Sequence, residues 1–394
     1  MTYAIPLSDG KFLNTSTLNQ HLLILGASGG GKTNTVEYLI QELTKLGVNC
    51  LVTDVKGDLS RLNKMRWLNT ETDEAYDAVT LCPFNRKGSG VSLKIGSMDA
   101  GLIGGLISKG GSITEAQKRV IMMAVGKGTD TYDLYDLHDN ITNHYSDSLN
   151  NPAVKNVLER ITYSIDVLGL NDLFGESDLL NADKIMQKHN NILNCTELVK
   201  NKYAYSQVIM QILESCYHLP EVGNQDAPKI ALFFDEAHLL FNALSKEQIA
   251  NLVAIVKLIR SKGVCLCFIS QSIDDIDDSV IGQLSTMIHH RLAVDGSTKG
   301  RKALDRIDKA LNVMSPVKTN YKQIITTLSI GQSVTVRLDK NRKPINPDVI
   351  QIPMSVATEE NWKPLTDAQF DELYPKVENG VTSIWQKIKL AIFG

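Results

Sequence analysis

The pattern of apolar and polar residues begins with a buried strand, a helix and a second buried strand. An apolar stretch at 21–25 is followed by a segment with helical periodicity at 32–46 and by another apolar stretch at 48–54. The two stretches are continuously apolar and show no alternation with polar residues. Such runs are typical of parallel strands that are covered on both faces. This part of the chain therefore predicts a parallel βαβ unit.

A second set of buried strands follows much later in the chain. An apolar stretch at 229–235 precedes a helical segment at 246–262 and a further apolar stretch at 264–269. Two more strands are predicted at 287–294 and 332–338. Together with the first unit, these elements predict an α/β fold with a mainly parallel sheet.

The regions around these strands have a different character. Helical periodicity with polar loops is seen at 112–126 and 152–168, whereas 341–364 is rich in Pro and Asn and is predicted to be irregular. A capping-box pattern at 366–369 predicts a short helix, and 381–393 predicts an amphipathic helix that packs on the core or on a neighbouring protein.

These patterns divide the chain into four parts. We expect an α/β core from two separate stretches, a mainly helical insertion between them, and an extension at each end. The core comprises 21–75 and 226–340, the insertion 76–225, and the two extensions 1–20 and 341–394.

Composition narrows the class of protein. Of 394 residues, 43% are apolar and 22% are charged, which is ordinary for a globular protein. With 44 acidic and 41 basic side chains the net charge is −3, so any contact with nucleic acid requires a local basic patch. The six cysteines form no C-x-x-C pair, which argues against a disulfide framework or a zinc site. No signal peptide and no apolar run of about 20 residues is found, so we expect a cytoplasmic protein without a membrane anchor.

The strongest chemical motif lies between the first strand and the first helix. Residues 26–33 read GASGGGKT, which matches the P-loop pattern G-x-x-x-x-G-K-[ST] in the expected structural context. Backbone N–H groups of such a loop surround a polyphosphate at the N-terminus of a helix. Lys32 is expected to reach the β- and γ-phosphates, and Thr33 to hold Mg²⁺. The residues expected to bind nucleotide are Gly26, Ala27, Ser28, Gly29, Gly30, Gly31, Lys32, Thr33 and Asn34.

A pair of carboxylates ends a later strand, in the sequence IALFFDEAH at 230–238. Asp235 is expected to complete the Mg²⁺ shell, and Glu236 to polarise the water that attacks the γ-phosphate. Hydrolytic motors need such a glutamate, whereas kinases of small molecules do not. His238 has two open interpretations: it couples hydrolysis to movement, or it caps the following turn.

Other polar residues follow neighbouring strands at the same edge of the predicted sheet. Ser270 and Gln271 end one strand, where a polar side chain would lie beside the γ-phosphate, and Asp54 ends another. Asp54 either touches the phosphate site or begins a turn. Cys265 and Cys267 lie two residues apart on one face of a strand, so core packing explains them better than metal binding.

The motifs, in this order, resemble the HerA-like branch of the HerA/FtsK motor ATPases. The matching segments are GASGGGKT at 26–33, VTDVKGDLS at 52–60, FFDEAHLLF at 233–241, RSKGVCLCFISQSIDDIDDSVIGQL at 260–284, HHRL at 289–292, GQSVTVRLD at 331–339 and KPLTD at 363–367. The resemblance implies a RecA-like P-loop core, a hexameric ring and ATP-driven movement on double-stranded DNA. It also implies roles for the matching residues: Lys32 and Thr33 as ligands of ATP and Mg²⁺, Glu236 as the catalytic carboxylate, Gln271 as a sensor, Arg260 as an arginine that acts on a neighbouring subunit, and Arg291 as a second candidate.

The sequence departs from the family in one respect and leaves alternatives open. HerA proper carries an N-terminal β-barrel, for which 20 residues are too few, so partner binding through that barrel is not expected. A superfamily 2 helicase is disfavoured because no second RecA-like domain with an arginine-rich motif follows Glu236. Two alternatives remain: an ATP-gated ring that serves as a scaffold for a nuclease or defence effector, and a packaging or conjugation motor of a mobile element.

Overall fold

The computed structural model describes most of the chain, with several gaps. The described residues are 4–18, 20–59, 67–68, 75–76, 78–81, 94–98, 100–108, 113–125, 131–175, 190–196, 198–222, 227–292, 297–339 and 341–355. The strands are β1 (Ala4–Pro6), β2 (Phe12–Asn14), β3 (Leu22–Leu25), β4 (Asn49–Asp54), β5 (Trp67–Leu68), β6 (Ala75–Tyr76), β7 (Ala78–Leu81), β8 (Asn190–Asn194), β9 (Ile230–Phe234), β10 (Val264–Ser270), β11 (Thr286–His290), β12 (Gln332–Leu338) and β13 (Pro344–Gln351). The helices are α1 (Thr15–Leu18), α2 (Lys32–Lys45), α3 (Ala100–Ile107), α4 (Glu115–Val125), α5 (Leu134–His144), α6 (Pro152–Asp166), α8 (Lys202–Tyr217), α9 (His238–Phe241), α10 (Lys246–Ile259), α11 (Asp278–Ile281), α12 (Thr298–Val313) and α13 (Tyr321–Thr327).

A nine-stranded sheet organises the described part of the chain, in the order β13-β12-β11-β3-β10-β9-β4-β8-β7. The strands from β11 to β7 pair in parallel, and β12 is antiparallel to both of its neighbours. The predicted α/β fold with a mainly parallel sheet is therefore confirmed. Among the described residues, no helix has both the length and the apolar character needed to cross a membrane.

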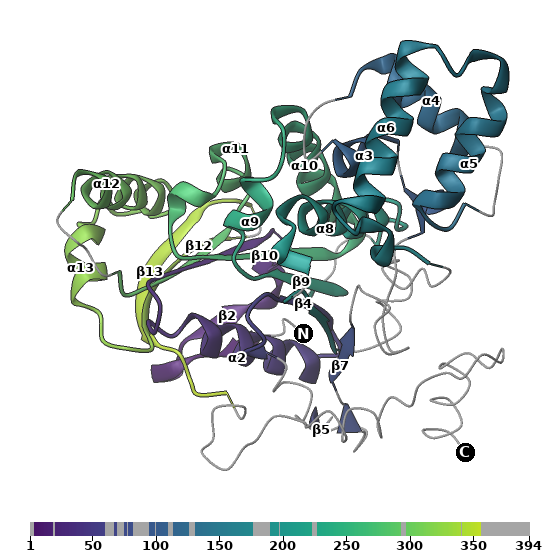
Figure 1. The fold of residues 1–394 in the computed structure, drawn as a ribbon. Coiled ribbons are helices and arrows are strands. Elements are labelled where there is room, and N and C mark those ends of the chain that lie inside the picture. Colours follow the sequence, from purple (N-terminus) through teal and green to yellow (C-terminus); the bar gives the residue numbers. More distant parts are fainter. Residues whose placement is uncertain are drawn as a thin grey trace.

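Apolar cores fill both faces of the sheet. On one face, α2 packs with Val36 and Leu39 against the sheet, together with Ile5 and Leu13 of the β1–β2 hairpin. On the other face, α8 and α10 cover the sheet, as Figure 1 shows. The segment at 1–20, predicted only as an extension, thus supplies the fully buried side chains of Ile5, Leu13 and Leu18 to the core.

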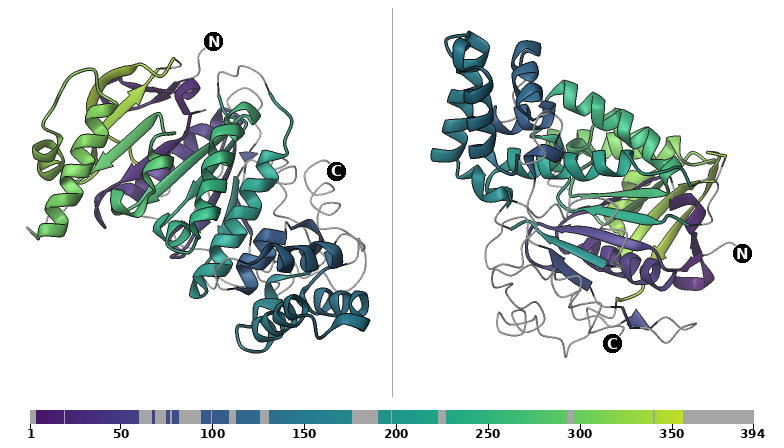
Figure 2. Two further views of the ribbon diagram at one scale, coloured as in Figure 1. Left: turned by 90° about the horizontal axis from the view of Figure 1, so that it is seen from above. Right: turned by 90° about the vertical axis from the view of Figure 1, so that its right-hand side faces the viewer.

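The helices α3 to α6 form a group at one end of the sheet, which all three views show (Figures 1 and 2). This group lies within 76–225, the range predicted to be a mainly helical insertion, and its α4 and α6 match the helices predicted at 112–126 and 152–168. The same range also supplies β7 and β8 to the central sheet. Its core is continuous with that of the sheet, because Ile103 of α3 and Leu232 of β9 belong to one buried cluster.

The C-terminal part of the described chain differs from the prediction. Residues 344–351, inside the stretch predicted to be irregular, form the edge strand β13. Pro347 argued against a strand in the sequence, because proline has no N–H group to donate to a neighbouring strand. The pairing shifts register between Thr335 and Arg337, and Pro347 lies opposite this irregularity on an edge strand, where proline is tolerated. The helices predicted at 366–369 and 381–393 lie outside the described residues.

His21 joins three elements at the start of β3. Its buried ring lies between α10 and β10: Nδ1 accepts a hydrogen bond from the N–H of Leu266 (3.1 Å), and Nε2 contacts the carbonyl oxygen of Val256 at 2.7 Å. Because Nδ1 is the acceptor, the neutral ring carries its proton on Nε2 and donates it to Val256. Burial is the main reason that the pKa of His21 is lowered to about 4.

We expect this histidine to make the protein sensitive to acid. Between about pH 6.5 and pH 4 the unfolded imidazole binds a proton that the folded ring does not, so the free energy of unfolding falls as the pH falls through this window. His21→Gln should be less stable at pH 7 and lose less stability on acidification, measured by urea unfolding at several pH values. His218→Gln, at an exposed site at the end of α8, is the control. An acid slope that is the same in wild type and His21→Gln would contradict the assignment.

Candidate active site

The glycine-rich segment between β3 and α2 adopts backbone conformations that other residues rarely take. Gly26, Gly29 and Gly31 have φ values of 152°, 72° and 113°. A Cβ on Gly26 would lie 2.7 Å from the Cβ of His290, so only glycine fits there. The N–H of Ala27 donates to the carbonyl oxygen of Arg291 (2.9 Å), which fixes the loop on the end of β11. The sequence pattern of a P-loop is thus matched by its backbone geometry.

Lys32 begins α2 and folds back onto this loop. Its Nζ donates to the carbonyl oxygens of Gly26 (2.7 Å) and Ala27 (3.0 Å). Burial, together with the positive charge of Lys56, lowers the pKa of Lys32, and Glu236 acts in the opposite direction. A partly buried ammonium group is thus held against carbonyl oxygens of the loop, where a bound phosphate would give it an anionic partner.

The next two residues of α2 differ in their surroundings. Thr33 is exposed to solvent at the mouth of the loop. The side chain of Asn34 is engaged by the chain that follows β13: its Nδ2 donates to the carbonyl oxygen of Pro353 and its Oδ1 accepts from the N–H of Ser355, both at 2.9 Å. The side chain of Asn34 is therefore already engaged. Only its backbone N–H is still predicted to contact the nucleotide.

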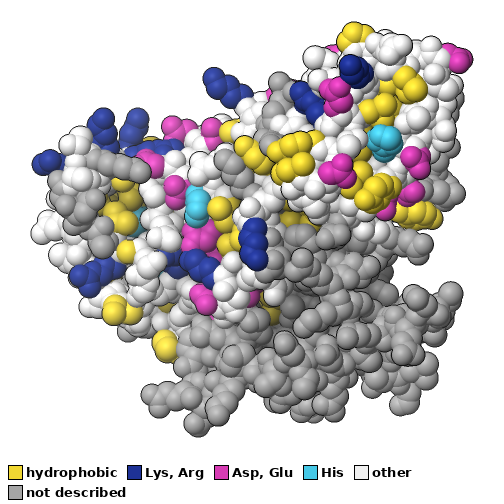
Figure 3. All heavy atoms as spheres, in the orientation of Figure 1, with side chains coloured by type: hydrophobic (Ala, Val, Ile, Leu, Met, Phe, Trp, Pro, Cys, Tyr) yellow, Lys and Arg dark blue, Asp and Glu magenta, His cyan; other side chains and the backbone are white. Residues whose placement is uncertain are grey.

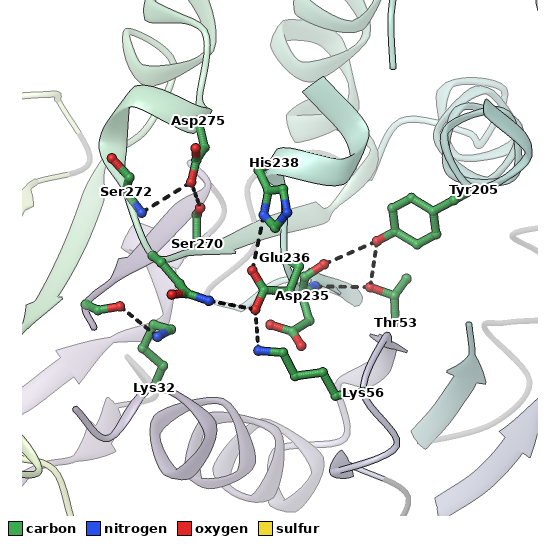
Figure 4. Close-up of polar contacts among 12 residues, drawn as sticks. Lys32, Thr53, Lys56, Tyr205, Asp235, Glu236, His238, Ser270, Ser272 and Asp275 are labelled. Atoms are coloured by element: carbon green, nitrogen blue, oxygen red, sulfur yellow. Dashed lines mark hydrogen bonds and ion pairs between the residues drawn. The ribbon is translucent and has the colours of Figure 1, made fainter. Parts of the chain in front are cut away.

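Glu236 lies at the centre of the polar network that Figure 4 shows. It has a φ of 48°, in the left-handed region, and its side chain is buried. Oε1 forms an ion pair with Lys56 and accepts a hydrogen bond from Nε2 of Gln271 (3.1 Å), and Nδ1 of His238 lies 3.1 Å from Oε2. Burial alone would raise the pKa of Glu236, but the hydrogen bonds from Lys56 and Gln271 lower it. The carboxylate is therefore held in its ionised form.

Asp235 is positioned through its backbone rather than its side chain. Its N–H donates to Oγ1 of Thr53 (3.0 Å), and its carbonyl oxygen accepts from the hydroxyl of Tyr205 (3.3 Å). Burial and the neighbouring charge of Glu236 raise the pKa of Asp235 to about 6. A carboxylate in such surroundings gains from a nearby cation, and in Figure 4 Asp235 and Glu236 face the side from which Lys32 and Lys56 approach.

These residues fit a magnesium site of the kind found with nucleotides. Among the described residues, no group of three His, Cys, Asp or Glu side chains could enclose a metal ion. Mg²⁺ commonly takes only one or two protein ligands and completes its shell with water and phosphate oxygens. The carboxylate of Asp235 and the exposed hydroxyl of Thr33 are the side chains that would hold it.

The remaining predicted residues divide into those that join the network and those that do not. Gln271 and His238 join it through Glu236. Ser270 instead donates to Oδ2 of Asp275 (2.5 Å), and Asp54 begins a turn by accepting from the N–H of Gly57 (2.7 Å). Cys265 and Cys267 are buried among apolar side chains, as predicted for core residues.

The two candidate arginines lie in different places. Arg291 follows β11 directly and is exposed, and its carbonyl oxygen contacts the P-loop. Arg260 is also exposed but begins the 3₁₀ turn that precedes β10. It thus lies where the parallel strands begin, about 20 Å from the end at which Gln271 follows β10.

Sequence reasoning missed three residues of this site. Lys56 pairs with Glu236, and Thr53 and Tyr205 hold the backbone of Asp235. Lys56 stands in the segment VTDVKGDLS, which carries part of the family resemblance, but a lone lysine in a polar turn gives no indication of its partner. Tyr205 comes from α8, and nothing in the sequence links that helix to the end of β9.

Comparison with known proteins places this site in a family. Residues 5–384 match the family model for the helicase HerA-like C-terminal domain. The DNA double-strand break repair helicase HerA of Saccharolobus solfataricus is 24% identical over 338 residues, which cover 82% of this chain and 63% of that protein. This chain thus spans less than two thirds of the length of that relative.

Two solved structures with a similar fold are those of TrwB and VirB4. The plasmid coupling protein TrwB in complex with ADP and Mg²⁺ has a TM-score of 0.63 at 15% identity, with 93% of this chain and 94% of that chain covered. VirB4 of Thermoanaerobacter pseudethanolicus has a TM-score of 0.61 at 14% identity, with 90% and 97% covered. At these identities the likeness establishes a RecA-like P-loop NTPase fold. Together with the match of the family model over almost the whole chain, it shows that this protein belongs to the HerA-like helicase C-terminal family.

Proposed function

We propose that this protein hydrolyses ATP and uses the energy to move on double-stranded DNA as a ring of six copies. One observation carries the proposal. The P-loop, whose glycines adopt conformations that other residues rarely take, lies at the same edge of the sheet as Asp235 and Glu236. The relative from Saccharolobus solfataricus is described as a DNA repair helicase, which supports duplex DNA as the partner.

In this proposal each residue has one task in the transfer of the γ-phosphoryl group to water. Lys32, released from its two carbonyl contacts, meets the charge of the β- and γ-phosphates. Glu236 accepts a hydrogen bond from the attacking water and takes up its proton as the bond to phosphorus forms. Gln271, which already touches Glu236, senses the γ-phosphate. Mg²⁺, held by Asp235 and Thr33, would neutralise charge on the phosphate oxygens.

A basic surface on α12 supports contact with DNA. Arg301, Lys302 and Lys309 are exposed on this helix, and Lys318 is exposed shortly after it. Figure 3 shows Lys and Arg side chains gathered over α12. Arg306 of the same helix is already paired with Asp278 at 2.6 Å. Because the net charge of the chain is −3, such a local patch is what binding to phosphates requires.

The location of Arg260 supports a ring. In its own subunit this arginine lies at the sheet edge opposite to Glu236, too far away to act on the same nucleotide. If this edge of one subunit packs against the nucleotide-binding edge of its neighbour, the guanidinium of Arg260 contacts the phosphates bound to the neighbouring subunit. Arginines supplied in this way contribute on the order of 10³–10⁵ in rate.

We expect two substitutions to separate binding from hydrolysis. Lys32→Ala should lose ATP binding, because no other side chain replaces the ammonium inside the loop. Glu236→Gln should bind ATP with near wild-type affinity and hydrolyse it at least about 100-fold more slowly, since the water loses its base. Binding is measured with a fluorescent ATP analogue and hydrolysis by phosphate release. Wild-type hydrolysis by Glu236→Gln would show that another group activates the water.

Duplex DNA should accelerate ATP hydrolysis if the protein is a motor. Lys302→Glu should weaken this stimulation and lower the slope of the salt dependence by about 1, because one phosphate contact is lost. Lys155→Glu, at an exposed lysine of α6, is the matched control. Rates are measured at several salt concentrations with and without DNA. Hydrolysis that is indifferent to duplex DNA would favour the ATP-gated scaffold instead.

Arg260 should act on the neighbouring subunit. Arg260→Ala and Glu236→Gln are each expected to be inactive alone and to regain part of the hydrolysis when mixed, at interfaces where both intact residues meet. Arg260→Lys should also be inactive, because lysine lacks the planar fork of arginine. Lys257→Ala, at an exposed residue of α10, is the control. No recovery in rings shown by native mass spectrometry to be mixed would transfer the role to Arg291.

A further inference from the structure

The carboxylate of Glu236 presents no free acceptor that a water molecule can reach from solvent. Oε1 already receives two donors, the ammonium of Lys56 and Nε2 of Gln271 at 3.1 Å. Oε2 is closed off from solvent and accepts no hydrogen bond from the described part of the chain, although Nδ1 of His238 lies 3.1 Å away. A group that activates water must present a free acceptor to it. The geometry is therefore that of a resting site.

Lys56 is the member of this network that is most readily displaced. The side chain of Glu236 is 6% exposed, whereas that of Lys56 is 47% exposed and projects from the turn after β4. The turn itself is fixed independently, by the hydrogen bond from Gly57 to Asp54. Lys56 can thus leave Glu236 without disturbing packing. The backbone of Glu236 is also strained, because a φ of 48° is unfavourable for a residue with a Cβ, and a change of conformation would relieve this strain.

We propose that Lys56 is an autoinhibitory latch: it holds the Glu236 carboxylate in a conformation that excludes water, and a bound polyphosphate draws Lys56 away for only part of the time by offering a competing anion. Lys56 lies close enough to Lys32 for the two charges to interact, so phosphates held by the P-loop lie within the range of both. Hydrolysis is thereby kept below the rate that a Glu236 free of Lys56 would support. The inference rests on the proposed function only in taking Glu236 as the group that activates water.

The first arm of the test measures hydrolysis. Lys56→Met removes the charge and keeps the length of the side chain, and it should raise kcat without DNA severalfold while KM changes less. Lys56→Arg, which retains a cation for Glu236, should raise kcat less than Lys56→Met does. Lys45→Met is the matched control, because Lys45 forms a surface ion pair with Glu42 at 2.7 Å on the far end of α2. A lower kcat in Lys56→Met overturns the latch and makes Lys56 a group required for the reaction.

The second arm does not depend on hydrolysis. A double-mutant cycle of Lys56→Met and Glu236→Gln, read by urea unfolding, should show coupling in the nucleotide-free protein and a smaller coupling with a non-hydrolysable ATP analogue. Absence of coupling without nucleotide, or an unchanged coupling with the analogue bound, overturns the latch. If the wild type itself does not hydrolyse ATP, the proposed function is wrong. The double-mutant cycle then still tests whether Lys56 holds Glu236. Lys56→Gln serves in both arms if Lys56→Met does not fold.

Discussion

The candidate site depends on the register of four neighbouring parallel strands. Ser270 at the end of β10 is level with Leu25 at the end of β3, whereas Phe234 at the end of β9 is level with Phe268 and Thr53. Because β9 ends two residues earlier than β10, Asp235 and Glu236 follow at the height of the P-loop. A shift of one strand by a residue would turn every side chain of that strand to the other face and would separate the acids from the loop.

The sequence predicted those parts of the site that local rules determine. A P-loop requires glycine at particular φ values, so its pattern is visible in eight consecutive residues, and Gly26, Gly29 and Gly31 adopt such conformations. Buried parallel strands are continuously apolar, so β3, β4, β9 and β10 were found close to their observed bounds. Gln271 was expected beside the γ-phosphate because it ends a buried strand of the sheet. The structure places it beside Glu236, and its contact with phosphate stays a prediction.

The parts that the sequence did not predict depend on contacts between distant segments. The pairing of Lys56 with Glu236 joins residues 180 positions apart, and that of Tyr205 with Thr53 joins residues 152 apart. The strand β13 was missed because Pro347 contradicts a strand by local propensity, while the edge location and the register irregularity that tolerate it are tertiary features. Likewise, β7 and β8 are short strands within a long range that otherwise reads as helices and polar loops.

The attachment of the chain after β13 has a mechanical consequence. Pro353 and Ser355 hold Asn34, and the hydroxyl of Ser355 donates to Glu37 at 2.8 Å, so this strand exit is fastened to the first turns of the helix that begins at the phosphate loop. Gly331, which precedes β12 at the same end of the hairpin, donates from its N–H to the carbonyl oxygen of Gly30 at 3.2 Å. The open end of the β12–β13 hairpin is thus hydrogen-bonded both to the phosphate loop and to the helix that follows it, so the loop cannot change its conformation without stretching contacts to this hairpin.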